Sequence, residues 1–494
     1  MTLPTAASRP LSAAVTADRQ PEPAAPPPRH GGQALANLDK VRHIVVLMLE
    51  SRSFDHMLGY LSLEGGRADI DGLRPEFCNR HAGLAYPVHP LGPGWSGAPH
   101  AAVQDGASVA RQIACENGGF IEDHLLNHPG EPHLAAVMGY YNAEQVPVYD
   151  FLARQFCVCD RWFSSVPGGA WPNRLYAVSG RAAGSRDSKR VPLYSNKSFL
   201  RHLDRARVSW KFYAPWKPWT LALTDDHYRT SEHYEPFGGT HRRYGFIGDA
   251  LAGGLPSVSW IDPHFYENGG HAPSDVLAGQ AQVAQVYQAL AASPQWPQTM
   301  FIVTYDQHGG FYDHVAPGAA SDNDPGFQRY GVRVPALVIS PWTAPAAASH
   351  VVYDHTSIIK TILLRFCRGA DGDIPDMGKR VAAAAHLGGL LSEAAPRAAP
   401  PPPPCALATL AAWRAELAAQ EWAVPTAGAA NAFAGARCMS AAEAGAVAAE
   451  KQIAKTAKQV AQGYAGGLLA SNVKRVKKRR QPGLDRAPPM LNGM

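Results

Sequence analysis

The chain has 494 residues, of which 46% are hydrophobic and 9% aromatic, enough for a large packed core, so a chain that is disordered throughout is excluded. Its longest unbroken aliphatic run, residues 44–49, is far shorter than the roughly 20 residues of a membrane-spanning helix. The formal net charge is +5, but residues 451–480 carry nine Lys or Arg and no acid, and subtracting these nine leaves −4 for the rest. A mildly acidic body argues against a protein built around nucleic acid.

The N-terminal segment predicts little structure. Residues 1–37 are rich in Pro and Ala and have no hydrophobic periodicity, so we expect a disordered or extended leader. It has no apolar stretch of about 7–15 residues, so we expect no secretory signal and a cytoplasmic location by default. Seven cysteines in so long a chain do not form a disulfide framework, and Cys157 and Cys159 are expected to be packed thiols.

Five apolar runs predict the strands of one sheet. The first, VRHIVVLML at 41–49, is continuous and rich in β-branched residues, as in a strand that is covered on both faces. Similar runs occupy 208–213, 255–261, 299–305 and 334–340. Residues 274–293 keep helical spacing after Ser274, which is expected to cap that helix. This alternation predicts an α/β fold with a mostly parallel central sheet flanked by helices.

A proline run divides the rest of the chain. PRAAPPPPP at 396–404 predicts a semi-rigid spacer after a domain of residues 38–395. Residues 405–494 are expected to form Ala-rich helices followed by a basic tail. The basic cluster at 474–480 is expected to be solvated and flexible; contact with anionic lipid is the alternative, and the cluster alone is weak support for nucleic acid.

Polar residues follow two predicted strands at their carboxyl ends. Residues 50–56 (ESRSFDH) follow the first strand, and residues 306–314 (DQHGGFYDH) follow the strand at 299–305. Ligands of open α/β sheets bind outside the carboxyl ends of strands, so the two segments are expected to converge on one site. Their carboxylates, oxygen donors and imidazoles suit a divalent cation that engages a phosphate or similar anion. The alternative is that these Asp and His residues only cap the turns that follow.

Six sequence blocks, in order, resemble the bacterial phosphoesterase family that contains phosphatidylcholine-specific phospholipases C and related acid phosphatases. The blocks are residues 43–61, 162–180, 271–280, 304–317, 332–342 and 353–363. The resemblance covers about residues 40–370 and implies an alkaline-phosphatase-like fold, hydrolysis of phosphoric esters, and a phosphoester or phospholipid as substrate or ligand. It gives no oligomeric state.

Carried over position by position, the resemblance places the covalent nucleophile at Ala170 and metal ligands at Glu50, Ser51, Asp306 and Gln307. The family has Thr or Ser at the position of Ala170, Asn at that of Ser51, and Glu or Asp at that of Gln307. A methyl group cannot attack phosphorus. The neutral Gln307 also replaces an anionic ligand, so a divalent metal, of unidentified kind, is expected to be held weakly.

The resemblance implies supporting roles for other residues. His271 and, in a more divergent block, His100 are expected near the phosphate, and Arg174 is expected to support a loop or an anionic oxygen. Orientation of the site is expected from Arg52, Asp55, Asp313, His314, Asp354 and His355.

Two routes could replace the missing nucleophile. Ser164, Ser165 and Ser179 are hydroxyls within ten residues of Ala170, and a metal-bound water is the other route. Two functions therefore stay open: a metal-dependent phosphoric ester hydrolase with a degenerate centre, or a non-catalytic protein that binds phosphoesters or phospholipids.

Overall fold

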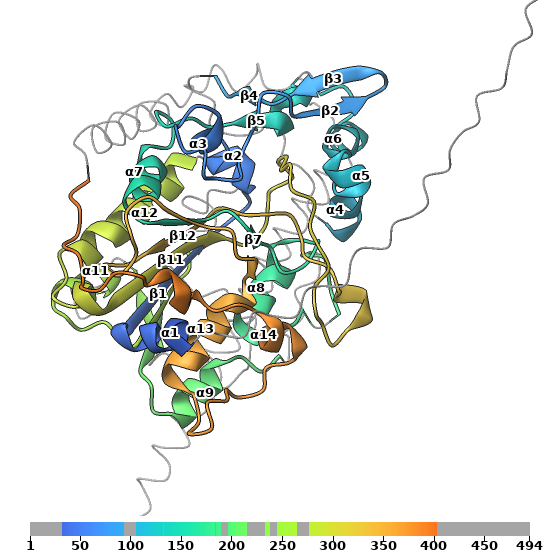
Figure 1. Ribbon diagram of the computed structural model, residues 1–494. Helices are drawn as coiled ribbons and strands as arrows, with labels where there is room; N and C mark the ends of the chain where they lie inside the picture. Colours follow the sequence, from blue (N-terminus) through green and yellow to red (C-terminus); the bar gives the residue numbers. More distant parts are fainter. Residues whose placement is uncertain are drawn as a thin grey trace, which may run out of the picture. The chain divides into compact units, whose positions relative to one another are not determined.

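The computed structural model describes residues 32–92, 105–131, 133–182, 184–188, 196–214, 233–237, 245–263 and 276–402 (Figure 1). His100, His271, Ser274, the predicted C-terminal helices and the basic tail lie outside these residues. The expectations for them therefore stay predictions.

Among the described residues, eight strands form one sheet in the order β13-β6-β12-β11-β1-β10-β8-β9. Every neighbouring pair is parallel except the two that involve β12. The predicted α/β fold with a mostly parallel sheet is thus confirmed. The strands are β1 (His43–Leu49), β6 (Cys157–Cys159), β8 (Trp210–Ala214), β9 (Tyr234–Pro236), β10 (Val258–Ile261), β11 (Thr299–Tyr305), β12 (Ala336–Ile339) and β13 (Ala347–Ser349).

The two central strands, β1 and β11, have the continuous apolar sequence of strands that are covered on both faces. Every residue of β11 is buried, and so is every residue of β1 after His43. Their register pairs Ile44 with Met300 and Leu49 with Tyr305. The two strands therefore end at the same level, and the residue that follows each lies at the same edge of the sheet.

Strand β12 runs antiparallel to both of its neighbours, β11 and β6. Residues 306–335, which join β11 to β12, contain only a short 3₁₀ helix, Pro325–Phe327. A parallel return would need a crossover of a dozen or more residues, usually a helix, that carries the chain back to the other end of the sheet. Here the connection instead builds loops at the carboxyl edge, so the chain re-enters the sheet in the opposite direction.

Two groups of helices flank the sheet (Figure 1). One contains α7 (Pro147–Gln155), α11 (Gly245–Leu251) and α12 (Val276–Ala291); α12 is the helix predicted at 274–293. The other contains α1 (Gly32–Asn37), α8 (Ala170–Ser179), α9 (Leu200–Arg205), α13 (Thr356–Phe366) and α14 (Lys379–Ala383). No helix in the described ranges is long and apolar enough to cross a membrane.

A further layer of short elements packs on the loops after β11. Asn117 donates to the carbonyl oxygen of Asp313 at 2.7 Å, and Tyr312 donates its N–H to that of Val137 at 2.9 Å. The elements of this part of the chain are α2 (Phe54–Leu58), α3 (Tyr60–Leu63), β2 (Cys78–His81), β3 (Leu84–Pro87), β4 (His89–Pro90), α4 (Gly106–Gln112), α5 (Ala114–Asn117), α6 (Phe120–Asn127) and β5 (Gly139–Tyr140). A small sheet pairs β7 (Trp162–Phe163) with β14 (Tyr353–Asp354).

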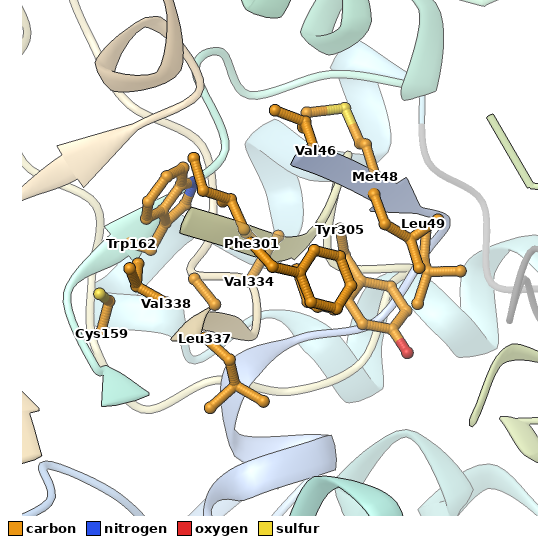
Figure 2. Close-up of a cluster of buried hydrophobic side chains, with 14 of the residues drawn as sticks. Val46, Met48, Leu49, Cys159, Trp162, Phe301, Tyr305, Val334, Leu337 and Val338 are labelled. Carbon is orange, nitrogen blue, oxygen red and sulfur yellow. The ribbon is translucent and has the colours of Figure 1, made fainter. Parts of the chain in front are cut away.

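The core lies where β1, β11 and β12 meet the flanking layers. Figure 2 shows Met48 and Leu49 of β1, Phe301 of β11, and Leu337 and Val338 of β12 in one cluster. These five side chains are fully buried. Cysteines at 157 and 159 are buried and free, as predicted.

The ends of the described chain are more ordered than the sequence suggests. Residues 32–37, predicted as part of the leader, form α1. In the proline run, Arg397 donates from its backbone N–H to Pro341 O at 2.9 Å and from its side chain to Thr343 O and Gln155 O at 3.0 and 2.7 Å. Residues 396–402 are therefore held against the domain, because the one arginine in the run is anchored.

Candidate active site

Two carboxylates meet at the carboxyl edge of the sheet, as the strand-end argument predicts. Glu50 follows β1 and Asp306 follows β11, and the N–H of Asp306 donates to Leu49 O at 3.0 Å. Ser51 has a left-handed backbone (φ 65°), and its N–H donates to Asp306 Oδ1 at 3.1 Å. The two segments that are remote in sequence therefore form one site.

Gly309 makes this close approach possible. Its φ is 71°, and a Cβ at this position would collide with the carbonyl group of Ser51. Only glycine combines that backbone conformation with the missing side chain. The glycine pair at 309–310 thus serves a tight turn rather than a phosphate-binding loop.

The guanidinium of Arg174 lies among the carboxylates. Arg174 is fully buried, and its Nε donates to Asp306 Oδ2 at 2.9 Å. Its Nη2 donates to Met48 O and Leu49 O at 3.1 and 3.2 Å and lies 4.0 Å from Glu50 Oε1. The sequence predicted a role for Arg174 on a loop or an anionic ligand, but the structure places it on the carboxylates themselves.

A third carboxylate, Asp262, was missed by the sequence analysis. It follows β10, its Oδ1 lies 3.7 Å from Arg174 Nη1, and it accepts a hydrogen bond from Trp260 Nε1 at 3.2 Å. Its side chain is fully buried. The strand-end argument, applied to the predicted strand at 255–261 as it was to the two others, would have found it.

The site holds more negative charge than Arg174 neutralises. Burial raises the pKa of Glu50 well above its ordinary value, and the charges of Asp306 and Asp262 add to this against the opposing Arg174. Burial also raises the pKa of Asp306, although Arg174 and the N–H of Ser51 lower it. The centre therefore favours protonation of its carboxylates more than an exposed acidic cluster would.

The two substituted ligand positions bind each other. Gln307 Nε2 donates to Ser51 Oγ at 2.5 Å, and Gln307 Oε1 accepts from the N–H of Gly309 at 2.6 Å. Both side chains are fully buried. The amide of Gln307 thus fixes the turn at 51 and 309, and both of its polar atoms are engaged in doing so.

The four predicted ligands do not fit a divalent cation in this arrangement. Asp306 accepts from Ser51 N–H at one oxygen and from Arg174 at the other. Gln307 and Ser51 are hydrogen bonded to each other. A cation binds oxygens at about 2.0–2.6 Å, whereas here the guanidinium of Arg174 faces both carboxylates, 2.9 Å from Asp306 and 4.0 Å from Glu50.

Another group with metal-ligand spacing lies among the described residues, at Asp55, Asp313 and His314. Here too a buried arginine intervenes: Arg333 contacts Asp55 Oδ1 at 2.9 Å and Asp313 Oδ1 at 2.8 Å. Both ring nitrogens of His314 face carboxylates, Asp55 at 2.7 Å and Asp71 at 3.2 Å. An imidazolium with both nitrogens protonated has no lone pair for a metal, so this group is an ion-paired network.

Two buried histidines position the loops of the site. Trp162 Nε1 donates to His355 Nδ1 at 3.3 Å, so the proton of the neutral ring is on Nε2, which donates to Asp306 O at 2.8 Å. Burial lowers the pKa of His355 to about 4 and that of His308 to about 3. His308 Nε2 donates to Gln112 Oε1 at 2.7 Å and joins the loop after β11 to α4.

The predicted nucleophile position begins helix α8. Ala170 is its first residue, and Gly169, the N-cap, offers no side-chain oxygen. A hydroxyl from a remote segment takes the capping role: Ser188 Oγ accepts from the N–H of Trp171 at 3.2 Å. Ser188 was missed by sequence reasoning, which weighed only serines close to Ala170 along the chain and has no pattern for a cap from another segment.

Two of the three serines weighed as substitutes have hydroxyls that are hydrogen bonded elsewhere. Ser164 Oγ donates to Val332 O at 3.0 Å, and Ser179 Oγ donates to Leu175 O at 2.7 Å. Ser165 is fully buried, and its Oγ has no hydrogen-bond partner among the described residues. Of the other predicted supporting residues, Arg52 is buried over the ring of Phe311, and the carboxylate of Asp354 contacts Arg380 at 3.3 Å. These positions suit structural support.

A family model and relatives with named activities agree with the resemblance. A model of the Phosphoesterase family matches residues 41–367. Non-specific phospholipase C6 of Arabidopsis thaliana is 33% identical over 360 residues, which cover 65% of this chain and 67% of that protein. Phospholipase C A of Mycobacterium tuberculosis is 27% identical over 404 residues, 68% of this chain and 74% of that protein. Among solved structures, a protein in the alkaline phosphatase superfamily from Vibrio parahaemolyticus has a TM-score of 0.35 and 11% identity over 69% of this chain and 70% of that one.

Proposed function

This chain belongs to the Phosphoesterase family, and we propose that it binds a phosphoester at the carboxyl edge of β1, β10 and β11 and hydrolyses it far more slowly than relatives with a hydroxyl at the position of Ala170. One observation carries the proposal. Helix α8 begins at Ala170 and also carries Arg174, which contacts Asp306. Ala170, the position at which the family has its nucleophile, therefore belongs to the same site as the buried carboxylates.

The proposed rate follows from the chemistry that is left. Without a hydroxyl at Ala170, no covalent phosphoenzyme can form there by the family's route. Loss of a covalent nucleophile in other hydrolases costs several orders of magnitude, and the residual rate comes from the surrounding electrostatics and from binding. In this chain the remaining groups are Arg174, the N-terminal end of α8, and the carboxylates of Glu50 and Asp262.

The proposed substrate class is a phospholipid phosphoester. The relatives from Arabidopsis thaliana and Mycobacterium tuberculosis are named as phospholipases C. A phospholipase C cleaves between the glycerol oxygen and the phosphate, so the ligand of this chain would present a phosphodiester with a polar head group.

A second candidate is a protein that binds the phosphoester and releases it unchanged. The observation in its favour is the ion pair between Arg174 and Asp306, together with the bond between Gln307 and Ser51. In this arrangement the predicted ligands stabilise one another and are not free to serve a reaction.

A turnover assay with matched variants separates the two candidates. We expect the triple variant Ser51→Asn/Ala170→Thr/Gln307→Glu to hydrolyse phosphatidylcholine or an aryl phosphorylcholine measurably, and at least about tenfold faster than wild type. The control is the matching triple variant Ser51→Asn/Ala170→Val/Gln307→Glu. Valine has the shape of threonine without the hydroxyl, so this control should hydrolyse the substrate at the wild-type rate.

Wild-type turnover as fast as that of the triple variant would contradict the proposal. Retained binding of phosphatidylcholine vesicles with no turnover in either protein would favour the second candidate. Loss of both binding and turnover in every variant would contradict a phosphoester function at this site.

A further inference from the structure

We infer that Arg174 is the resident cation of this centre: its guanidinium occupies the place between the ends of β1, β10 and β11 that a divalent ion would take, and the carboxylates are held without a metal. The inference concerns what assembles the centre and does not rest on phosphoester binding or turnover.

The position of the guanidinium carries the argument. Its three nitrogens face the three strand ends: Nε lies 2.9 Å from Asp306 after β11, Nη1 lies 3.7 Å from Asp262 after β10, and Nη2 lies 4.0 Å from Glu50 after β1. An ion bound by these three carboxylates would lie about 2.0–2.6 Å from an oxygen of each. The same three carboxylates face the guanidinium, so in this structure it supplies the positive charge that such an ion would bring.

The chemistry of arginine suits this place. A guanidinium stays charged at any pH at which proteins are folded, and its planar fork carries five donors in fixed directions. Nη2 donates hydrogen bonds to the carbonyl oxygens of Met48 and Leu49, at the end of β1, at 3.1 and 3.2 Å. Arg174 therefore neutralises charge and also satisfies the last carbonyl groups of the central strand.

The backbone of Arg174 is fixed by its neighbour. Asn173 is fully buried; its Nδ2 donates to the carbonyl oxygens of Val166, Gly168 and Gly169 at 3.0–3.2 Å, and its Oδ1 accepts from the N–H of Val166 at 3.0 Å. The loop before α8 is thus closed on the helix at the residue next to Arg174. The guanidinium is held in place from its backbone as well as from its contacts.

The same device occurs at two other places in the domain. Arg333 joins Asp55 and Asp313 at 2.9 and 2.8 Å, and Arg380 joins Asp322 and Asp354 at 3.0 and 3.3 Å. Both arginines are buried. A buried arginine that gathers carboxylates from separate segments is therefore an ordinary structural element of this chain, and at Arg174 it stands at the strand ends.

The test uses the full-length protein without any phosphoester. After dialysis against EDTA we expect wild type to contain no stoichiometric metal, and its Tm should not change when Mg²⁺, Ca²⁺, Mn²⁺ or Zn²⁺ is added. Arg174→Met, which keeps the apolar length without the charge, should unfold several degrees lower. Divalent metal should then raise the Tm of this variant, and Glu50→Gln added to it should abolish that rescue.

Arg174→Lys serves as the charge-conserving variant. It should fold with a Tm between those of wild type and Arg174→Met and remain insensitive to metal, so the test stands even where Arg174→Met does not fold. The inference would be overturned if wild type contained a stoichiometric metal, if removal of that metal lowered the Tm, and if Asp306→Asn no longer bound it. A folded Arg174→Met with the wild-type Tm, or one that no divalent metal stabilises, would overturn it too. None of these results depends on the turnover assay.

Discussion

Buried ionic residues in this domain act in pairs and triplets that join distant segments, and the histidine of one such group should make stability depend on pH. His314 lies between Asp55 and Asp71, and Arg333, which pairs with Asp55, lies beside the ring at 3.3 Å from Nδ1. Removal of one partner from a buried ion pair leaves an uncompensated charge and is strongly destabilising. The protonation state of His314 is therefore coupled to folding.

The direction of that dependence follows from the pKa of His314. Burial lowers this pKa, but the charge of Asp55 and the hydrogen bonds to Asp55 and Asp71 outweigh it and raise the pKa to about 9. A histidine whose pKa is raised on folding stabilises fully below its unfolded value near 6.5 and loses this contribution as the pH rises through 9. We expect the free energy of unfolding to fall by about 3 kcal/mol between pH 6 and pH 10 from this group.

Urea unfolding at a series of pH values measures the effect, with His314→Gln as the control. The variant should lose this part of the pH dependence while keeping the shape of the side chain. An equal slope in wild type and variant would contradict the assignment of the effect to His314.

At the same scale, part of the site could be predicted from the sequence. Glu50 and Asp306 were found because each directly follows a long apolar strand, and strand ends share an edge. The contact of Arg174 with Asp306 was not predicted, because it joins residues 132 positions apart and no local pattern encodes which partner a buried arginine takes. The cap that Ser188 gives to α8 was missed because it comes from a residue that lies after the helix in the sequence.

Among the strands of the described central sheet, those of four or more residues were predicted from the sequence and those of three residues were not. The runs at 41–49 and 299–305 became β1 and β11, whereas β6, β9 and β13 have three residues each, too few to show a period in the sequence. The antiparallel direction of β12 depends on the path of residues 306–335, which apolar patterning does not reveal. The loops of that connection begin near Gly309 and carry Asp306 and Gln307 of the candidate site.

A glycine substitution tests how tightly that connection is built. Gly309→Ala would place a methyl group against the carbonyl of Ser51 at a φ of 71°, so both the contact and the backbone conformation oppose it. We expect a loss of about 2–4 kcal/mol in the free energy of unfolding. Gly318→Ala is the matched control in the same connection, since nothing lies within 4 Å of its Cβ position, and it should change stability by about 0.5 kcal/mol or less. Similar values for the two variants in urea unfolding would contradict the argument.

For the molecule as a whole, the sheet, the loops at its carboxyl edge and the flanking helices other than α1 and α14 lie within the range that the family model matches, residues 41–367. The described chain continues past that range to residue 402. Tyr287 of α12 donates to the carbonyl oxygen of Pro400, and Trp296 donates to that of Arg397 at 3.0 Å. The proline run is thus bound to the helix layer by its carbonyl groups and by one arginine, and the stability of the domain should depend on it.

Truncation measures this dependence. A chain that ends at residue 402 keeps the three hydrogen bonds that Arg397 donates to Pro341, Thr343 and Gln155, whereas a chain that ends at residue 394 loses them and exposes Trp296, which is only 5% exposed. Each hydrogen bond contributes about 0.5–1.5 kcal/mol, so the shorter chain should be less stable by about 2–4 kcal/mol and unfold several degrees lower. Arg397→Ala in the longer chain should reproduce only the part of this loss that comes from the two side-chain hydrogen bonds. Equal unfolding temperatures for the two truncated chains would mean that the spacer contributes nothing to the domain and that the boundary predicted at residue 395 from the sequence is the physical one.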